Sequence, residues 1–129
     1  MNAKLWITVV GILALTLAAC RSNPVYTVSG APVATSTRSY ALKDVRNAIQ
    51  QAGTSLGWQM KETGRGMIVG TLYVRDHMAQ VEIPYDRSSY SILYRDSKNL
   101  DYDGANIHSN YNGWVQNLSK AINARLSAL

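Results

Sequence analysis

The chain has a single cysteine and no phenylalanine among its 129 residues. One cysteine cannot form a disulfide within the chain, and a free thiol would be a liability in an oxidising compartment. Eight tyrosines and three tryptophans supply the aromatic side chains instead. Because a tyrosine hydroxyl needs a hydrogen-bond partner or water, we expect part of a tyrosine-rich sheet to face solvent.

The sequence also lacks an apolar run long enough to cross a bilayer, which takes about 20 residues. The longest run covers residues 5–19, which is 15 residues, and the polar residues 21–24 follow it. A single positive charge at Lys4 precedes the run, and the small residues Ala18 and Ala19 end it. This order is typical of a secretory signal peptide rather than a transmembrane helix. We therefore predict a leader at residues 1–19.

The end of this leader, Leu17-Ala18-Ala19-Cys20, resembles a bacterial lipobox. The resemblance implies peptidase cleavage between Ala19 and Cys20 and a diacylglyceryl group on the Cys20 sulfur, which would also remove the free thiol. Enteric lipoproteins retained in the inner membrane tend to have aspartate in the next position, where this chain has Arg21. The resemblance thus implies an outer-membrane protein that faces the periplasm. Secretion with a free cysteine and a retained membrane anchor are the alternatives.

The charge balance is modestly basic, with 13 basic and 8 acidic side chains and a formal charge of +5. Removing residues 1–19 takes away Lys4, which lowers the charge to +4 and leaves 110 residues, a length that suits one domain. Such a surface favours anionic lipid head groups, lipopolysaccharide phosphates or acidic protein faces, and a surface charge that only keeps the protein in solution is the alternative. There is no dense stripe of Lys and Arg, so we expect no nucleic-acid partner.

The first part of the mature chain, residues 20–38, reads as a lipidated N-terminus and a flexible tether. It is rich in Ser, Thr, Pro and Gly and has no sustained apolar period, so it cannot bury enough surface to offset the entropy cost of ordering. We expect it to let the domain stand off from the membrane, with a short strand at residues 25–28 as a local alternative. Residues 39–129 are then a single domain.

Two segments have the periodicity of amphipathic helices. The first helix is expected at residues 40–56, with Ser39 before it as the N-cap and Gly57 ending it. Residues 109–129 give the strongest helix pattern, with apolar side chains at steps of three and four. The predicted stripes are Leu42, Val45, Ile49, Ala52 and Leu56 in the first helix, and Tyr111, Trp114, Val115, Leu118, Ala121, Ile122, Arg125 and Leu126 in the second.

Between the helices, four segments alternate apolar and polar residues and are joined by short polar turns. They cover residues 58–63, 67–75, 78–84 and 89–95, with a two-residue turn expected at Asp76-His77. This pattern predicts an antiparallel meander. The fold class is therefore α+β: helix, four-stranded meander, helix, with both helices on one face of the sheet. The helices should cover Ile68, Leu72, Val74, Ala79, Val81 and Ile83, which leaves Val69, Tyr73, Arg75, Met78 and Gln80 on the open face. The face taken by Tyr90, Ile92 and Tyr94 depends on the register and stays undecided.

The residues that carry chemistry are few. His77 and His108 are far apart in sequence, and nothing in the pattern brings them together or supplies the further ligands that a metal site needs. There is no Gly-x-Ser-x-Gly elbow and no glycine-rich phosphate loop. Most carboxylates lie in predicted turns, where they accept backbone hydrogen bonds. We therefore expect no catalytic residues, no metal and no cofactor.

Two places are candidate binding sites. One is the open sheet face, represented by Tyr73 and Arg75, because aromatic, Met and Arg side chains are enriched at protein interfaces; an ordinary amphipathic surface is the alternative. The other is the corner at residues 107–114, which holds His108, Asn110 and Asn112 where a loop enters the last helix. Helix capping by Ser109 or Asn110, with Tyr111 and Trp114 in the core, is the alternative there.

The lipobox and residues 57–114 together resemble small proteobacterial envelope lipoproteins of uncharacterised activity. The matching residues are Gly57-Trp58, Arg75, His77, Ile83-Pro84-Tyr85, Tyr90-Ser91-Ile92, Tyr94 and the segment from Ile107-His108 to Trp114. We expect a non-enzymatic binding or assembly module that is anchored to the membrane through Cys20 and has an envelope protein as partner. The alternative is a cell-wall glycan-binding or cell-wall-modifying protein that uses the His108 corner with Asp101 and Asp103. A third, weaker hypothesis is recognition of anionic lipid by the basic surface.

Overall fold

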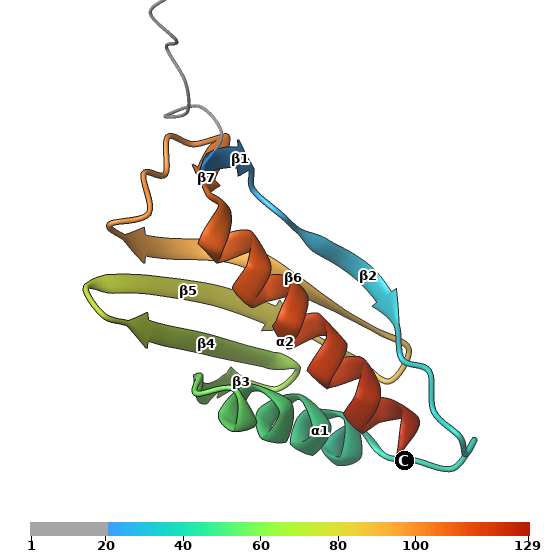
Figure 1. Ribbon diagram of the computed structural model, residues 1–129. Coiled ribbons are helices and arrows are strands. Elements are labelled where there is room, and N and C mark those ends of the chain that lie inside the picture. The colour runs from blue at the N-terminus through green and yellow to red at the C-terminus, as the bar shows by residue number, and fades with distance from the viewer. Residues whose placement is uncertain (1–20) are drawn as a thin grey trace, which may run out of the picture.

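The computed structural model describes residues 21–129. The predicted leader, the cleavage site at Ala19 and Cys20 and the lipidation site itself lie outside the described residues. Within them the order of elements is β1 (Ser22–Pro24), β2 (Val28–Pro32), α1 (Leu42–Ser55), β3 (Gln59–Gly64), β4 (Met67–Val74), β5 (His77–Pro84), β6 (Ser89–Lys98), β7 (Asn106–His108) and α2 (Ser109–Ser127). The predicted α+β class is confirmed (Figure 1).

The main sheet has five strands in the order β2-β6-β5-β4-β3. Strands β3 to β6 pair consecutively and antiparallel, as the turn pattern predicts. The prediction of four strands was wrong by one, because β2 pairs with the free edge of β6, with Val28 opposite Ile92. Val28 is also buried in the core, so one apolar side chain and the main chain together hold this edge strand.

The N-terminal segment is also more ordered than predicted. Strand β1 pairs antiparallel with β7, with Ser22 opposite His108 and Asn23 opposite Ile107. The expected flexible tether over residues 20–38 is therefore corrected for β1 and β2. Its polar side chains cannot form a core of their own, but main-chain hydrogen bonds to existing strand edges need no apolar side chains.

Helix α1 begins and ends close to its predicted bounds, with a side-chain hydrogen bond at its start and a glycine after its end. Its N-cap is Ala41 and not the predicted Ser39, and the Asp44 carboxylate accepts a hydrogen bond from the Ala41 N–H at 2.8 Å. Residue Gly57 follows the last turn with φ +89°, a conformation that glycine adopts without strain. The predicted end at Gly57 is confirmed.

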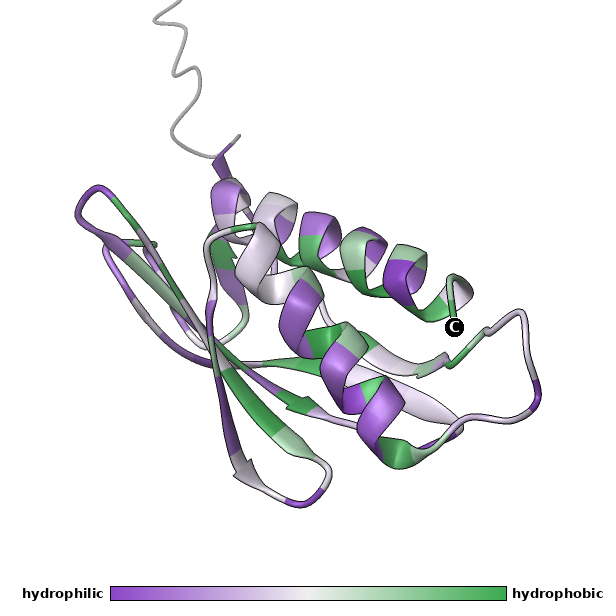
Figure 2. Ribbon diagram, turned by 90° about the horizontal axis from the view of Figure 1, so that it is seen from below, coloured by the Kyte–Doolittle hydropathy of each residue, from purple (hydrophilic) through white to green (hydrophobic). Residues whose placement is uncertain are grey.

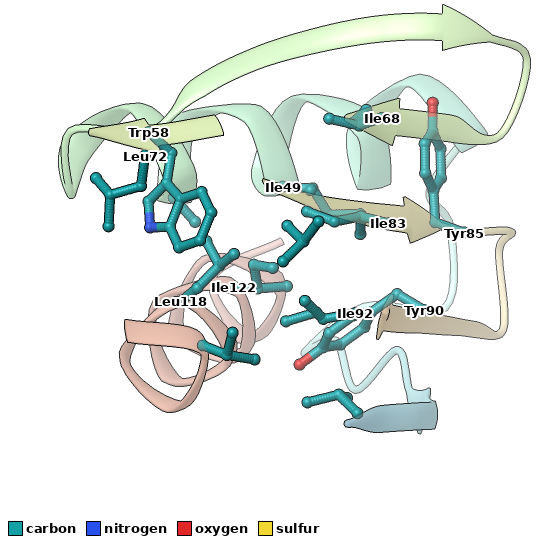
Figure 3. Packing of buried hydrophobic residues seen from close by; sticks show 14 of the residues in the cluster. Ile49, Trp58, Ile68, Leu72, Ile83, Tyr85, Tyr90, Ile92, Leu118 and Ile122 are labelled. Atoms are coloured by element: carbon teal, nitrogen blue, oxygen red, sulfur yellow. The ribbon is translucent and has the colours of Figure 1, made fainter. Parts of the chain in front are cut away.

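The hydrophobic core lies between the two helices and one face of the sheet (Figures 1 and 3). Helix α2 contributes its predicted stripe, of which Leu118 and Ile122 are fully buried. Figure 2 shows the apolar side of this helix turned toward the sheet. The structure also decides the face of Tyr90 and Ile92, which belong to this core.

Candidate functional site: the open sheet face and the histidine corner

The open sheet face is the side of β3 to β6 that points away from the core. Cross-strand pairing places Lys61, Val69, Glu82 and Leu93 in one row across four strands. In a second row Tyr73 pairs with Met78, and Met78 pairs with Lys98. The alternation of side chains along each strand puts both rows on the same face.

The buried apolar side chains of this face are Val69 and Met78. Each is 7% exposed, although neither belongs to the core cluster beneath the helices. Tyr73, which lies opposite Met78, has 62% of its surface exposed. This confirms the outward placement of these three residues, which period-two alternation predicts.

A polar pair separates Val69 from Met78, because Thr71 pairs with Gln80 between the Val69–Glu82 and Tyr73–Met78 pairs. The Gln80 amide donates to the Thr71 hydroxyl at 3.1 Å, and the Arg95 guanidinium lies 3.5 Å from the Glu82 carboxylate. Exposed ion pairs of this kind contribute little to stability, so these groups are free to exchange partners. The face thus has Val69 beside the Glu82–Arg95 ion pair and an aromatic and Met pair, Tyr73 and Met78, with Thr71 and Gln80 between them.

The β4–β5 turn differs by one residue from the prediction. It consists of Arg75 and Asp76, and His77 is the first residue of β5. Residue Arg75 is exposed and has φ +56°, a left-handed conformation that a two-residue hairpin turn uses. The side chain expected on the open face thus belongs to a turn at the end of that face.

The two histidines, which the sequence pattern leaves apart, come together in the folded chain. Their ring centroids are 6.4 Å apart in a stacked arrangement, and the Trp114 ring lies 6.4 Å from His77. The expectation that nothing joins them is thus corrected. The start of β5 pairs with the end of β6, where Met78 lies opposite Lys98, and the His108 N–H donates to the carbonyl oxygen of Leu100 just beyond β6. His77 Nδ1 lies 2.7 Å from the carbonyl oxygen of Asn99 and so donates to it.

The polar groups of the 107–114 corner are largely engaged with backbone. His108 is the N-cap of α2 and its Nδ1 accepts from the Asn110 N–H at 3.1 Å, where Ser109 or Asn110 had been expected to cap. The Asn112 amide bonds to the backbone of Pro24 and Tyr26, whereas the Asn110 side chain is exposed. A capping imidazole was missed because Ser and Asn are the usual N-caps.

In the loop that precedes β7, a carboxylate is likewise engaged with backbone groups. The Asp103 carboxylate accepts hydrogen bonds from the N–H groups of Ala105 and Asn106, and the bond from Asn106 is the larger cause holding the pKa of Asp103 below its usual value. Asp101 is exposed in the same loop. The described part of the chain has four cavities of about 190 to 350 Å³, and none of the four is lined by Asp101, Asp103, His108 or Asn110.

One of those cavities is a basic cleft that the sequence pattern did not reveal. It has a volume of about 270 Å³, and Lys43, Arg46, Arg65, Glu62 and Tyr85 are among the residues that line it. Arg46 lies 3.8 Å from Glu62, so one of the three cations is partly neutralised. Burial chiefly raises the pKa of Tyr85. Helix α1 and the β3–β4 turn contribute the cations, which lie too far apart in sequence for a motif.

Residues 21–129 contain no group of three or more His, Cys, Asp or Glu side chains that could hold a metal ion. In the same residues, no helix is long and apolar enough to cross a membrane. No protein-family model, curated protein or solved structure matches the chain.

Proposed function

We propose that this chain is a lipid-anchored, non-enzymatic protein of the bacterial envelope, a module that binds a protein partner through the open sheet face. The observation that carries the proposal is that Val69, Met78 and Tyr73 lie on the sheet face that neither α1 nor α2 covers. Strands with one face toward solvent normally carry polar residues there. Apolar and aromatic side chains with a charged border are the composition of protein interfaces.

The anchor supports a binding role over a freely diffusing one. The segment Leu17-Ala18-Ala19-Cys20 resembles a lipobox, whose cysteine carries three acyl chains in bacterial lipoproteins. Two or more chains give stable membrane attachment. We expect the chain at the periplasmic face of the outer membrane. Replacing Cys20 with Ser should abolish incorporation of labelled palmitate and release the protein from the membrane fraction.

Site-specific photo-crosslinking in cells tests the binding face. A photoreactive phenylalanine analogue at Tyr73 should capture one envelope protein reproducibly. Tyr26 is a matched control because it is 37% exposed and lies on the α2 side of the sheet. There it is close enough to Tyr90 to add to the rise in the pKa of the Tyr90 hydroxyl, which burial chiefly causes. Capture at both positions, or at neither, contradicts the proposal.

A second variant makes the test quantitative. Replacing Val69 with Lys, with the probe at Tyr73, should lower the yield of that adduct at least tenfold while the protein keeps its abundance and circular dichroism. An unchanged yield would mean that the captured protein is only a neighbour.

The cell-wall hypothesis has one observation in its favour, which is the meeting of His77, His108 and Trp114. Aromatic rings with adjacent nitrogen donors are suitable for a sugar ring. However, the Nδ1 atoms of both histidines already bond to backbone groups. Co-sedimentation of the unlipidated domain with purified cell wall, lost in Trp114→Ala and kept in Tyr73→Ala, would favour this alternative over the sheet face.

A further inference from the structure

The N-terminal strand β1 starts two residues after the proposed lipidation site, and it is bound to the body of the domain. From this we infer that the chain has no tether: the end of the domain formed by β1, β7 and the start of α2 rests on the phospholipid head groups of the leaflet that holds the anchor. This inference rests on the proposed lipidation of Cys20.

The first step is the length of chain between the lipid and the fold. Consecutive Cα atoms are about 3.8 Å apart, so two fully extended residues span at most about 7 Å. Only Arg21 separates Cys20 from Ser22, the first residue of β1. A lipid on Cys20 therefore keeps β1 within about 7 Å of the anchored residue.

The second step is the attachment of β1 to the domain. Ser22 and Asn23 pair with His108 and Ile107, and Ile107 is fully buried. The Val25 N–H donates to the carbonyl oxygen of Ala105 at 3.1 Å. These contacts tie the segment to the loop before β7, so β1 is a part of the folded body.

The third step closes the segment against α2. The Tyr26 N–H donates to the side-chain oxygen of Asn112, and the Asn112 amide nitrogen donates to the carbonyl oxygen of Pro24. Residues 22–26 are thus held from two sides. Peeling them off the domain to make a tether would break the β1–β7 ladder and both of these bonds.

The fourth step is the direction of the domain away from that end. Helix α2 starts at β7 and runs to the opposite end of the domain, where the C-terminus lies (Figure 1). Its 19 residues rise about 1.5 Å each, which gives roughly 28 Å. Tyr102, 42% exposed in the loop before β7, belongs to the residue type that concentrates at membrane–water interfaces.

The single cysteine of the chain makes this arrangement measurable. Once Cys20 carries lipid, an introduced cysteine is the only free thiol. Ala105→Cys and Ala128→Cys are a matched pair, because both alanines are exposed and they lie at opposite ends of the domain. The purified lipidated protein, in phosphatidylcholine vesicles with a nitroxide on the head group, is labelled with a fluorophore at either position.

We expect quenching at position 105 to exceed quenching at position 128 at least threefold. Inserting 12 Gly and Ser residues between Arg21 and Ser22 should remove most of this difference, because it supplies the tether that the natural chain lacks. Equal quenching at the two positions, or a difference that survives the insertion, overturns the inference.

The state of Cys20 separates this result from a failure of the proposed function. Mass spectrometry of the purified chain reports the acyl groups directly. A chain without them overturns the lipid anchor and the seating together, whereas an acylated chain with equal quenching overturns the seating alone.

Discussion

The side chain of Asn112 in the first turn of α2 bonds to the backbone of Pro24, which lies 88 residues earlier in the chain. Its Nδ2 donates to the Pro24 carbonyl oxygen at 2.9 Å, and its Oδ1 accepts from the N–H of Tyr26 at 2.8 Å. One amide group therefore joins the segment between β1 and β2 to the last helix. The residue expected as a binding group in the 107–114 corner has a structural role in the same corner.

Replacing Asn112 with Ala should loosen this segment. We expect a loss of about 1–2 kcal/mol in the free energy of unfolding, since each net hydrogen bond contributes roughly 0.5–1.5 kcal/mol. Urea denaturation measures the loss, and limited proteolysis should show earlier cleavage within residues 22–27. Asn117→Ala, at an exposed position on the same helix, is the control for helix propensity. Equal stability of the two variants would contradict the bridging role.

The hydroxyl groups of Tyr111 and Tyr90 predict opposite effects of the same substitution. Tyr111 is fully buried, and its hydroxyl has no hydrogen-bond partner within the described residues. Burial raises the pKa of this hydroxyl. Tyr111→Phe removes an unpaired polar group from the core, so stability should stay unchanged or rise by up to about 1 kcal/mol.

The matched substitution Tyr90→Phe removes a hydroxyl that bonds to Asn123 at 2.6 Å and to Ser119 at 2.9 Å. We expect it to cost about 1–2 kcal/mol because these partners stay in place without it. Urea denaturation compares both variants with the natural chain. An equal loss in Tyr111→Phe would show that its hydroxyl has a bound partner such as water.

The β3–β4 hairpin has two glycines with different requirements, Gly64 at the end of β3 and Gly66 in the turn. Gly66 has φ +77°, and a Cβ there would lie 2.8 Å from the Tyr85 carbonyl oxygen. Gly66→Ala should therefore lower stability by roughly 2 kcal/mol, from left-handed strain of about 1–2 kcal/mol and the backbone contact. Gly64 has no atom within 4 Å of the Cβ position, so Gly64→Ala should be nearly neutral. Thermal denaturation of the two variants tests the difference, and equal melting temperatures would refute it.

Acid stability should depend on Asp86. Backbone N–H groups of Ser88 and Ser89 and the Ser88 hydroxyl hold the pKa of Asp86 below its usual 3.8. Because the pKa is lower in the folded than in the unfolded state, this contribution is complete above the unfolded pKa and is lost as the pH falls through the folded pKa.

The test compares melting temperatures over the range from roughly pH 5 to about pH 2, where such contributions are lost. Asp86→Asn keeps an acceptor oxygen but does not titrate, so its melting temperature should fall less steeply with acid than that of the natural chain. Asp101→Asn removes the same charge from another exposed position and is the control. A slope for Asp86→Asn that matches the natural chain would contradict the assignment.

Much of the open sheet face could be predicted from alternation alone. Val69 and Tyr73 fall on the opposite side from Ile68 and Leu72 in any extended strand, whatever its partners are. The helix of residues 109–127 was equally accessible, because Tyr111, Val115, Leu118, Ile122 and Leu126 form a stripe at helical spacing and are all fully buried. Both patterns are local, so they need no knowledge of the neighbouring elements.

The histidine corner and the basic cleft could not be predicted in this way. His77 meets His108 only because β5 begins near the end of β7, and Arg46 meets Glu62 only because α1 packs beside β3. Such meetings depend on strand order and register, which the spacing of residues along one element does not contain.

Local periodicity in the sequence was thus sufficient for the α+β class, for both helices, for four strands and for the side chains of the open face. Tertiary structure alone decided the strand pairing of β1 and β2 within residues 22–32, the sheet face of Tyr90 and the N-cap of α2. The physical reason is that β1 and β2 are held chiefly by main-chain hydrogen bonds to β7 and β6. Every residue type except proline offers the same backbone donors and acceptors, so the side chains of an edge strand carry little sign of the pairing.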